Sequence, residues 1–169
     1  MKRSLVNFAL FYAGWFASVS FHDGRSLLAV VAVVGLHLLL STSRVADLRT
    51  LGWAVLLGAG ADTLLERSGL LQYAGGPRIL FFCPLWIAGL WALFATTLNS
   101  SLGWLKGRPI AAALLGALGG PLSYFTAARF GAVEIGPAGL IAVGVEYAVL
   151  VPVLVLVAHG VALVRRSAA

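Results

Sequence analysis

The chain has 169 residues, of which 60% are hydrophobic and 11% are charged, and its formal net charge is +6. Soluble domains are about half apolar and about a quarter charged, so a water-soluble fold of this composition would lack the polar surface that it needs. The 12 Lys and Arg residues are spread singly or in pairs between apolar segments, which excludes the dense basic face of a nucleic-acid-binding protein. Paired cations beside apolar segments are instead typical of membrane topology.

Six apolar segments follow one another and predict an all-α, polytopic transmembrane helical bundle, with short loops and a single domain over residues 1–169. We expect the spans at about residues 5–20, 27–40, 51–65, 79–102, 109–128 and 137–164. The fourth and sixth are long enough for a hydrocarbon core of about 30 Å at about 1.5 Å per residue. The second and third are short, so four spans with a re-entrant pair are the alternative.

The distribution of cations predicts the orientation of these spans. Eight lie in connections on one side: Lys2, Arg3, Arg44, Arg49, Lys106, Arg108, Arg165 and Arg166. Four lie on the other: Arg25, Arg67, Arg78 and Arg129. Because short cytoplasmic loops carry the excess of Lys and Arg, we expect a bacterial inner-membrane protein with both termini in the cytoplasm.

Metal, redox and cofactor sites are not expected. Cys83 is the only cysteine, so neither an internal disulfide nor a CxxC motif can form. Three scattered histidines do not make a zinc motif. The chain also lacks GxSxG, P-loop, GxGxxG and HExxH motifs, so no catalytic residue is assigned.

Polar residues in the periplasmic half of the spans predict a polar cavity built from Asp62, Tyr124, Arg129 and Glu146. Asp62 and Glu66 are spaced i,i+4, so they share a helix face. Charged groups within spans usually face the bundle interior, and two nearby carboxylates suit proton or cation handling. The alternative is a structural ion pair of Arg129 with Glu146 or Asp62.

A second polar group lies toward the cytoplasmic side. It comprises Asn7, His37, Thr96, Thr97, Asn99, Ser100 and Ser101. As a binding site, Asn99 would bind a lipid head group while Lys106 and Arg108 meet its phosphate. The alternative is hydrogen bonding between helices. Trp86 can either stack on a ligand or fill the bundle core.

The fifth predicted span carries a GxxxG pattern at Gly116 and Gly120, which lets helix backbones approach closely. Pro121 follows and is expected to kink the span beside Ser123 and Tyr124. The bend either lines a ligand cavity or packs tightly. The face formed by Gly116 and Gly120 also predicts contact with a second copy of the chain in a homo-oligomer.

Three blocks of the sequence are distinctive: Asn7-Phe8 with Gly14-Trp15, residues 84–102 with the run ATTLNSSL, and residues 116–124 with the sequence GALGGPLSY. Together they resemble a family of small bacterial inner-membrane proteins of unknown function, over nearly the whole chain. Such families often accompany genes for fatty-acyl modification, including cyclopropane-synthase-like methyltransferases, so the resemblance implies a lipid-related role. Its candidate residues, without assigned roles, are Asn7, Trp15, Asp62, Trp86, Asn99, Pro121, Ser123 and Tyr124.

Three hypotheses for function follow. The first is a lipid-linked protein that binds, moves or helps to modify phospholipids or acyl chains, with membrane lipids as its partners. The second is a small transporter or channel with Asp62 and Glu146 as proton or cation sites, although the chain lacks the repeated halves of many transporters. The third is a structural membrane subunit. The sequence leaves open whether the protein is an enzyme.

Overall fold

The computed structural model describes secondary structure for residues 2–166 and side chains for residues 4–160. This part of the chain is mostly helical, as predicted. The helices are α1 (Lys2–Phe21), α2 (Gly24–Leu40), α3 (Arg44–Arg67), α4 (Leu85–Leu98), α5 (Pro109–Arg129) and α6 (Pro137–Arg166). A short 3-10 turn, η1 (Gly103–Leu105), and two strands, β1 (Leu71–Tyr73) and β2 (Val133–Ile135), complete the fold.

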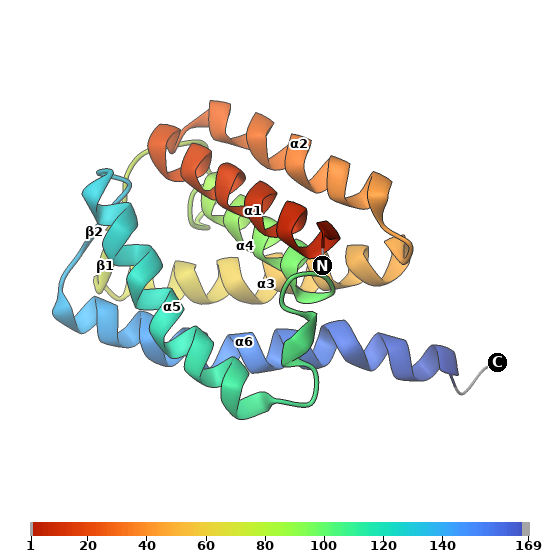
Figure 1. The fold of residues 1–169 in the computed structure, drawn as a ribbon. Helices are drawn as coiled ribbons and strands as arrows, with labels where there is room; N and C mark the ends of the chain where they lie inside the picture. Colours follow the sequence, from red (N-terminus) through yellow and green to blue (C-terminus); the bar gives the residue numbers. More distant parts are fainter. Residues whose placement is uncertain (1, 167–169) are drawn as a thin grey trace.

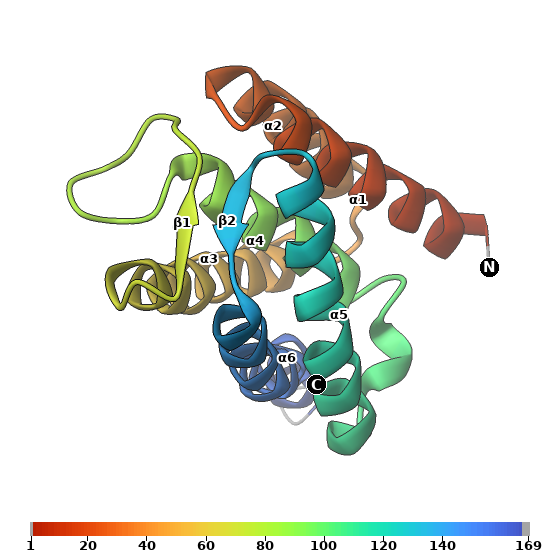
Figure 2. The same ribbon diagram turned by 90° about the vertical axis from the view of Figure 1, so that its left-hand side faces the viewer.

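The six helices form one bundle in which α4 lies among α1, α2 and α3, and α6 packs on α3 and α5 (Figure 1). Successive helices run back and forth. The start of α1, the α2–α3 and α4–α5 connections and the end of α6 therefore lie toward one end, on the right of Figure 1. The paired strands lie at the opposite end, which we call the hairpin end and which comprises β1, β2 and the adjoining residues 68–84 and 130–136 (Figure 2).

The chain is a membrane protein by the length and composition of its helices. Three helical stretches are long and apolar enough to cross a bilayer: Ser4–Phe21, Pro109–Arg129 and Pro137–Gly160. The apolar helices α2 and α4 have 17 and 14 residues, so each is shorter than a full crossing of about 20 residues. Six crossings and cytoplasmic termini stay predictions.

The outer surface of the bundle is apolar. On α5, Leu114, Leu118 and Leu122 are 59%, 73% and 66% exposed, and they follow one another at i,i+4 spacing. This stripe is what a lipid-facing helix presents, because residues at that spacing share one face. The helix also continues through Pro121.

The predicted bounds of the fourth span, 79–102, are wrong, because α4 is much shorter. Residues 79–84 are apolar but form a loop, which the backbone N–H of Leu85 closes by donating to the Pro77 carbonyl at 2.9 Å. Pro84 disfavours helical backbone in the residue before it. At the other end, the N–H of Leu102 turns back to the Thr97 carbonyl at 2.8 Å and ends the helix. The third span, predicted at 51–65, is in contrast longer at both ends.

The short strands were not predicted, and they control where Tyr73 points. β1 and β2 pair antiparallel, with Tyr73 opposite Val133. Along β1, Leu71 and Tyr73 are buried while Gln72 is exposed. Because side chains alternate across a strand, the pairing turns Tyr73 into the bundle.

The GxxxG face of α5 packs against α6 of the same chain. A Cβ atom at Gly116 would lie 2.2 Å from the backbone oxygen of Tyr147, and one at Gly120 would lie 2.6 Å from Cγ of that tyrosine. Only glycine permits this approach. The face is therefore occupied within the chain, and the homo-oligomer predicted through Gly116 and Gly120 has no free surface there.

Candidate functional site

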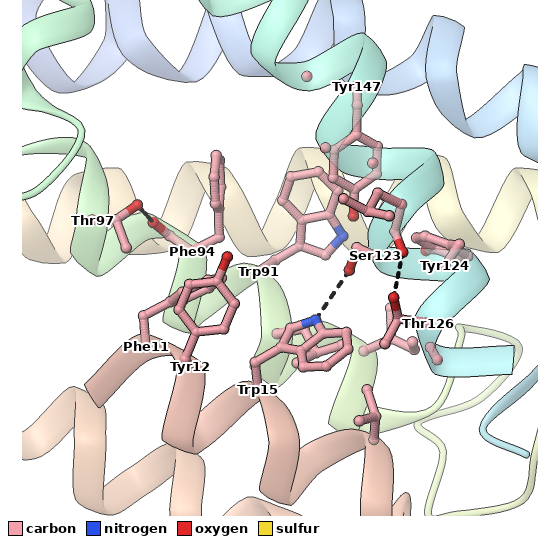
Figure 3. Close-up of a pocket in the computed structure, with 18 of the residues that line it drawn as sticks. Phe11, Tyr12, Trp15, Trp91, Phe94, Thr97, Ser123, Tyr124, Thr126 and Tyr147 are labelled. Atoms are coloured by element: carbon pink, nitrogen blue, oxygen red, sulfur yellow. Dashed lines mark hydrogen bonds between the residues drawn. The ribbon is translucent and has the colours of Figure 1, made fainter. Parts of the chain in front are cut away.

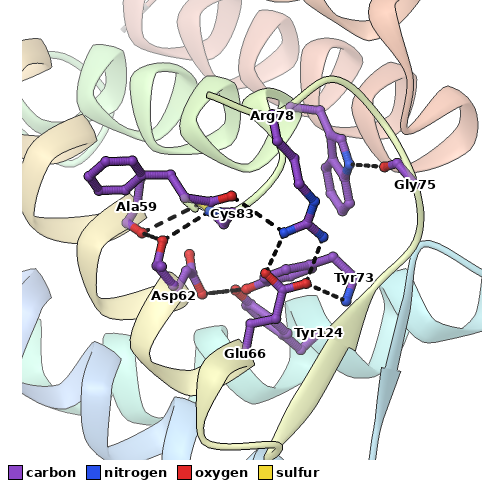
Figure 4. A network of polar contacts seen from close by, with 11 residues as sticks. Ala59, Asp62, Glu66, Tyr73, Gly75, Arg78, Cys83 and Tyr124 are labelled. Carbon is purple, nitrogen blue, oxygen red and sulfur yellow. Dashed lines mark hydrogen bonds and ion pairs between the residues drawn. The ribbon is translucent and has the colours of Figure 1, made fainter. Parts of the chain in front are cut away.

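Asp62 on α3 is the centre of a buried hydrogen-bond cluster near the hairpin end (Figure 4). Its side chain is fully buried. Oδ1 accepts hydrogen bonds from the phenols of Tyr73 at 2.6 Å and of Tyr124, and Oδ2 accepts one from Nε1 of Trp91 at 2.6 Å. The two phenol oxygens lie 2.7 Å apart. These donors come from β1, α4 and α5, so one carboxyl group joins four elements.

Tyr73 is held in the form that donates to this carboxyl group. Burial raises the pKa of its phenol well above the ordinary value, and the neighbouring Asp62 adds to the shift. The phenol is therefore protonated at neutral pH. A buried carboxyl oxygen without a hydrogen-bond partner costs free energy. In this cluster, the two phenols and the indole donate to Asp62 in place of water.

The outer edge of the cluster is closed by an ion pair. Both terminal nitrogens of Arg78 donate to Glu66, at 2.8 and 2.7 Å, and Arg78 Nη1 also reaches the Phe82 carbonyl at 3.4 Å. The Glu66 carboxylate raises the pKa of Arg78 above its ordinary value. Glu66 also accepts from the backbone N–H of Tyr73 at 3.4 Å. This pair therefore fixes the loop 74–84 over the cluster and leaves Glu66 with a structural role.

A cavity of about 390 Å³ leads from the cluster to the surface between α1, α4 and α5 (Figure 3). Its inner wall includes Asp62, Tyr73 and Tyr124. Phe8, Tyr12 and Phe16 of α1 line it as well, and these three rings are 45%, 44% and 46% exposed. The cavity therefore opens on the side of the bundle, among apolar side chains, and ends at a polar cluster.

Aromatic rings form most of the wall. Trp91 lies 4.9 Å from Tyr147 between ring centroids, at an interplanar angle of 34°. Tyr147 also meets the ring of Tyr124 edge-on at 6.1 Å. Across the opening, Nε1 of Trp15 donates to Oγ of Ser123 at 3.0 Å, which joins α1 to α5 (Figure 3). Rings in these geometries keep the cavity walls in place.

Four of the nine predicted site residues line this cavity: Asp62, Trp86, Ser123 and Tyr124. Asp62 and Tyr124, which the sequence predicts to lie close together, form a direct hydrogen bond. Arg129 does not join them. Its guanidinium lies over the Phe125 ring, 4.9 Å from the centroid, and no ion pair links it to Asp62 or Glu146 among the described side chains.

Glu146 on α6 makes no hydrogen bond to the cluster. Both of its carboxyl oxygens are buried, and neither has a hydrogen-bond partner among the described residues. Glu146 is also not a lining residue of the cavity. The predicted periplasmic cavity thus contains Asp62 and Tyr124, while Arg129 and Glu146 lie outside it.

The remaining predicted residues, Asn99, Lys106 and Arg108, lie toward the opposite end of the bundle and do not line the cavity. Nδ2 of Asn99 donates to Oδ1 of Asp47 at 2.9 Å, so its amide is used within the protein. Oδ2 of Asp47 accepts from Ser41 at 2.5 Å and lies 3.4 Å from Nε2 of His37. This arrangement favours the alternative of hydrogen bonding between helices.

Asn7 belongs to the same end and has a similar role. Its amide nitrogen donates to the Thr96 carbonyl at 3.1 Å, and its oxygen accepts from Ser101 at 2.8 Å. Both contacts join α1 to residues in or just after α4. Together with the contacts of Asp47, they fasten the first four helices to one another.

Several cavity residues were missed by sequence reasoning. Tyr73 lies in a segment interpreted as a loop, whereas the sequence allows Trp91, like Trp86, either to stack on a ligand or to fill the bundle core. The sequence did contain a signal, since aromatic residues recur along the first span at positions 8, 11, 12, 15 and 16. No three His, Cys, Asp or Glu side chains gather closely enough to hold a metal ion in the part of the chain that the structure describes.

Comparison with known proteins gives one match. Residues 4–153 match a family model described as "Protein of unknown function (DUF2878)". No curated protein and no solved structure matches the chain.

Proposed function

The chain belongs to the family described as "Protein of unknown function (DUF2878)", and from the geometry of its cavity we propose that it binds the hydrocarbon chain of a membrane lipid. The observation that carries the proposal is an aromatic cavity that opens among half-exposed rings of α1 and ends at Asp62. Ligand sites are typically concave and mostly apolar, with a few placed polar groups. In this role the protein holds a phospholipid or acyl chain for movement or modification.

The opening between α1 and α5 supports entry from the bilayer. Phe16 of α1 and Leu122 of α5 line the cavity and are 46% and 66% exposed. Both belong to helices long and apolar enough to cross a membrane. A lipid chain can therefore move sideways from the bilayer into the cavity without crossing water.

The location completes the proposal. The protein lies in the bacterial inner membrane with about six spans and both termini in the cytoplasm. The back-and-forth course of the helices supports this, because it brings the connections that carry eight of the cations to one end and those with four to the other. The cavity and the Asp62 cluster then lie toward the periplasm.

The test is the recovery of lipid with the purified protein. After exchange into detergent, native mass spectrometry should detect a retained lipid on the wild-type chain. Gly119 lines the cavity, and a Cβ atom there meets nothing within 4 Å, so Gly119→Phe fills the cavity without a backbone clash. We expect this variant to lose the lipid.

Gly52→Phe is the matched control. Gly52 is also an exposed helical glycine with open space at its Cβ position, but it does not line the cavity. Retention by Gly52→Phe together with loss by Gly119→Phe supports the proposal. A wild-type protein that carries no lipid, or equal retention by both variants, overturns it.

A second candidate is favoured by one observation, the two buried oxygens of Glu146, which have no hydrogen-bond partner in the part of the chain that the structure describes. Burying a carboxylate without partners is costly, so such a group is suited to binding a proton or a cation. On this alternative the protein is a small proton- or cation-coupled transporter that uses Glu146 and Asp62.

Proton flux into liposomes that contain the purified protein distinguishes this alternative. A flux that disappears with Glu146→Gln supports transport and contradicts a purely lipid-binding role. Absence of flux, or a flux that the substitution leaves unchanged, eliminates the transport candidate.

A further inference from the structure

The polar groups offered to a ligand lie level with the middle of α1. Tyr12 is halfway along α1, about 15 Å from either helix end at about 1.5 Å per residue. It projects from α1 into the cavity (Figure 3). Ser123 faces the same region, because its partner Trp15 follows Tyr12 by three residues on the same helix. A ligand's polar group therefore sits far from the layer of lipid head groups.

These two groups act as hydrogen-bond donors. Oγ of Ser123 accepts from Nε1 of Trp15, and the Ser123 hydroxyl proton has no acceptor among the described residues. The phenol of Tyr12 makes no hydrogen bond in the described part of the chain, although its ring contacts Phe8 and Phe11 edge-on at 4.7 and 5.3 Å. A hydroxyl group with a free proton pairs with an acceptor such as a carbonyl or ester oxygen.

The charged residues of the cavity wall do not suit a phosphate group inside the cavity. Among the residues that line the cavity, Asp62 alone is an Asp, Glu, Lys or Arg. Two cations near the hairpin end of the bundle are already engaged, Arg78 with Glu66 and Arg129 over Phe125. A phosphate in the cavity would therefore be desolvated without a cation, which is strongly unfavourable.

Hydrocarbon contacts cannot select one lipid over another, since the bilayer is as apolar as the cavity wall. Selection then depends on the polar group. We infer that the cavity prefers an uncharged lipid, with carbonyl or ester oxygens that accept from Tyr12 and Ser123, to lipids that carry a phosphate. This inference rests on the proposed function.

Tryptophan fluorescence can test this selectivity, because three of the five tryptophans line the cavity: Trp15, Trp86 and Trp91. The other two, Trp53 and Trp104, are 49% and 52% exposed and are replaced by phenylalanine to remove their signal. In this background, the protein in detergent micelles is titrated with dibrominated diacylglycerol or with phosphatidylglycerol that has the same brominated chains. Bromine quenches the tryptophans that it approaches.

We expect diacylglycerol to quench at a mole fraction about five times lower than phosphatidylglycerol. The phosphate keeps the ester oxygens of phosphatidylglycerol near the head-group layer, away from Tyr12, and one net hydrogen bond supplies a factor of about five. Tyr12→Phe removes one donor and keeps the ring, so it should bring the ratio of the two mole fractions toward one. Gly119→Phe should abolish quenching by diacylglycerol.

The outcomes separate the inference from the proposed function. If both lipids quench equally and Gly119→Phe blocks both, the cavity binds lipid chains but the inferred selectivity is wrong. If neither lipid quenches, or if Gly119→Phe leaves quenching unchanged, the proposed function fails as well.

Discussion

Trp91 on α4 and Asp62 on α3 are joined by a hydrogen bond of 2.6 Å from the indole nitrogen to Oδ2. The same indole packs over Gly58, where a Cβ atom would lie 2.0 Å from the ring. The glycine lets the helices approach, and the carboxyl group four residues later fixes the orientation of the indole. The wall of the cavity and the centre of the polar cluster are therefore one structural unit.

Replacing Asp62 should destabilise this unit. Asp62→Leu leaves the indole of Trp91 and the phenols of Tyr73 and Tyr124 without their acceptor. Each buried donor without a partner costs roughly 1–3 kcal/mol, so we expect a large fall in the midpoint of thermal unfolding in detergent. Tyr73→Phe removes one donor and should cost less. Equal midpoints for wild type and Asp62→Leu would contradict the role of the cluster.

Arg78→Gln should loosen the loop 74–84 without unfolding the bundle. Arg78 is partly exposed, and partly exposed ion pairs contribute about 0–1 kcal/mol, so the unfolding midpoint should change little. The loop, however, loses the contacts to Glu66 and to the Phe82 carbonyl. Limited proteolysis should cut it faster than in the wild type. Arg25→Gln, which removes the exposed pair with Asp23, is the control and should leave cleavage of this loop unchanged.

Two glycines on α5 should respond in opposite ways to alanine. Gly116→Ala places a methyl group 2.2 Å from the Tyr147 backbone oxygen and should force α5 away from α6. Gly119→Ala meets nothing within 4 Å and should stabilise the helix by about 0.5–1 kcal/mol. Unfolding midpoints in detergent check both expectations. A tolerated Gly116→Ala would contradict the close packing of these two helices.

Asn99→Ala should reduce stability and leave lipid binding intact. Its amide donates to Asp47, which the substitution deprives of one partner, and we expect a loss of about 1–3 kcal/mol. Because Asn99 does not line the cavity, lipid retained on the folded variant should equal that of the wild type. Loss of the lipid from a folded Asn99→Ala protein would place the binding site at the other end of the bundle.

The sequence predicts the longest helices well, because charges or prolines bound their apolar runs. Pro109 and Pro137 start α5 and α6 at the predicted residues. Prediction from the sequence fails at residues 79–84, an apolar segment that forms a loop. Hydrophobicity alone does not distinguish a membrane span from an apolar loop.

The candidate site could be predicted only in part, for a physical reason. Asp62 and Tyr124 are notable as polar groups within apolar helices, and both belong to the cluster. Tyr73 reaches it through the pairing of two three-residue strands far apart in the chain. Asn99 meets Asp47 across 52 positions. Such partners depend on the order of helices around the bundle, which segment lengths do not contain.

Photo-crosslinking in the membrane tests the central claim most directly. Cells that express the protein are fed a fatty acid with a diazirine on its chain, irradiated, and the labelled peptides are identified by mass spectrometry. We predict labels on the cavity residues Phe11, Trp15 and Ser123, in addition to the outward Leu114 and Leu118 of α5, and loss of only the cavity labels in Gly119→Phe. Labels confined to outward-facing residues in the wild type would contradict lipid binding in the cavity.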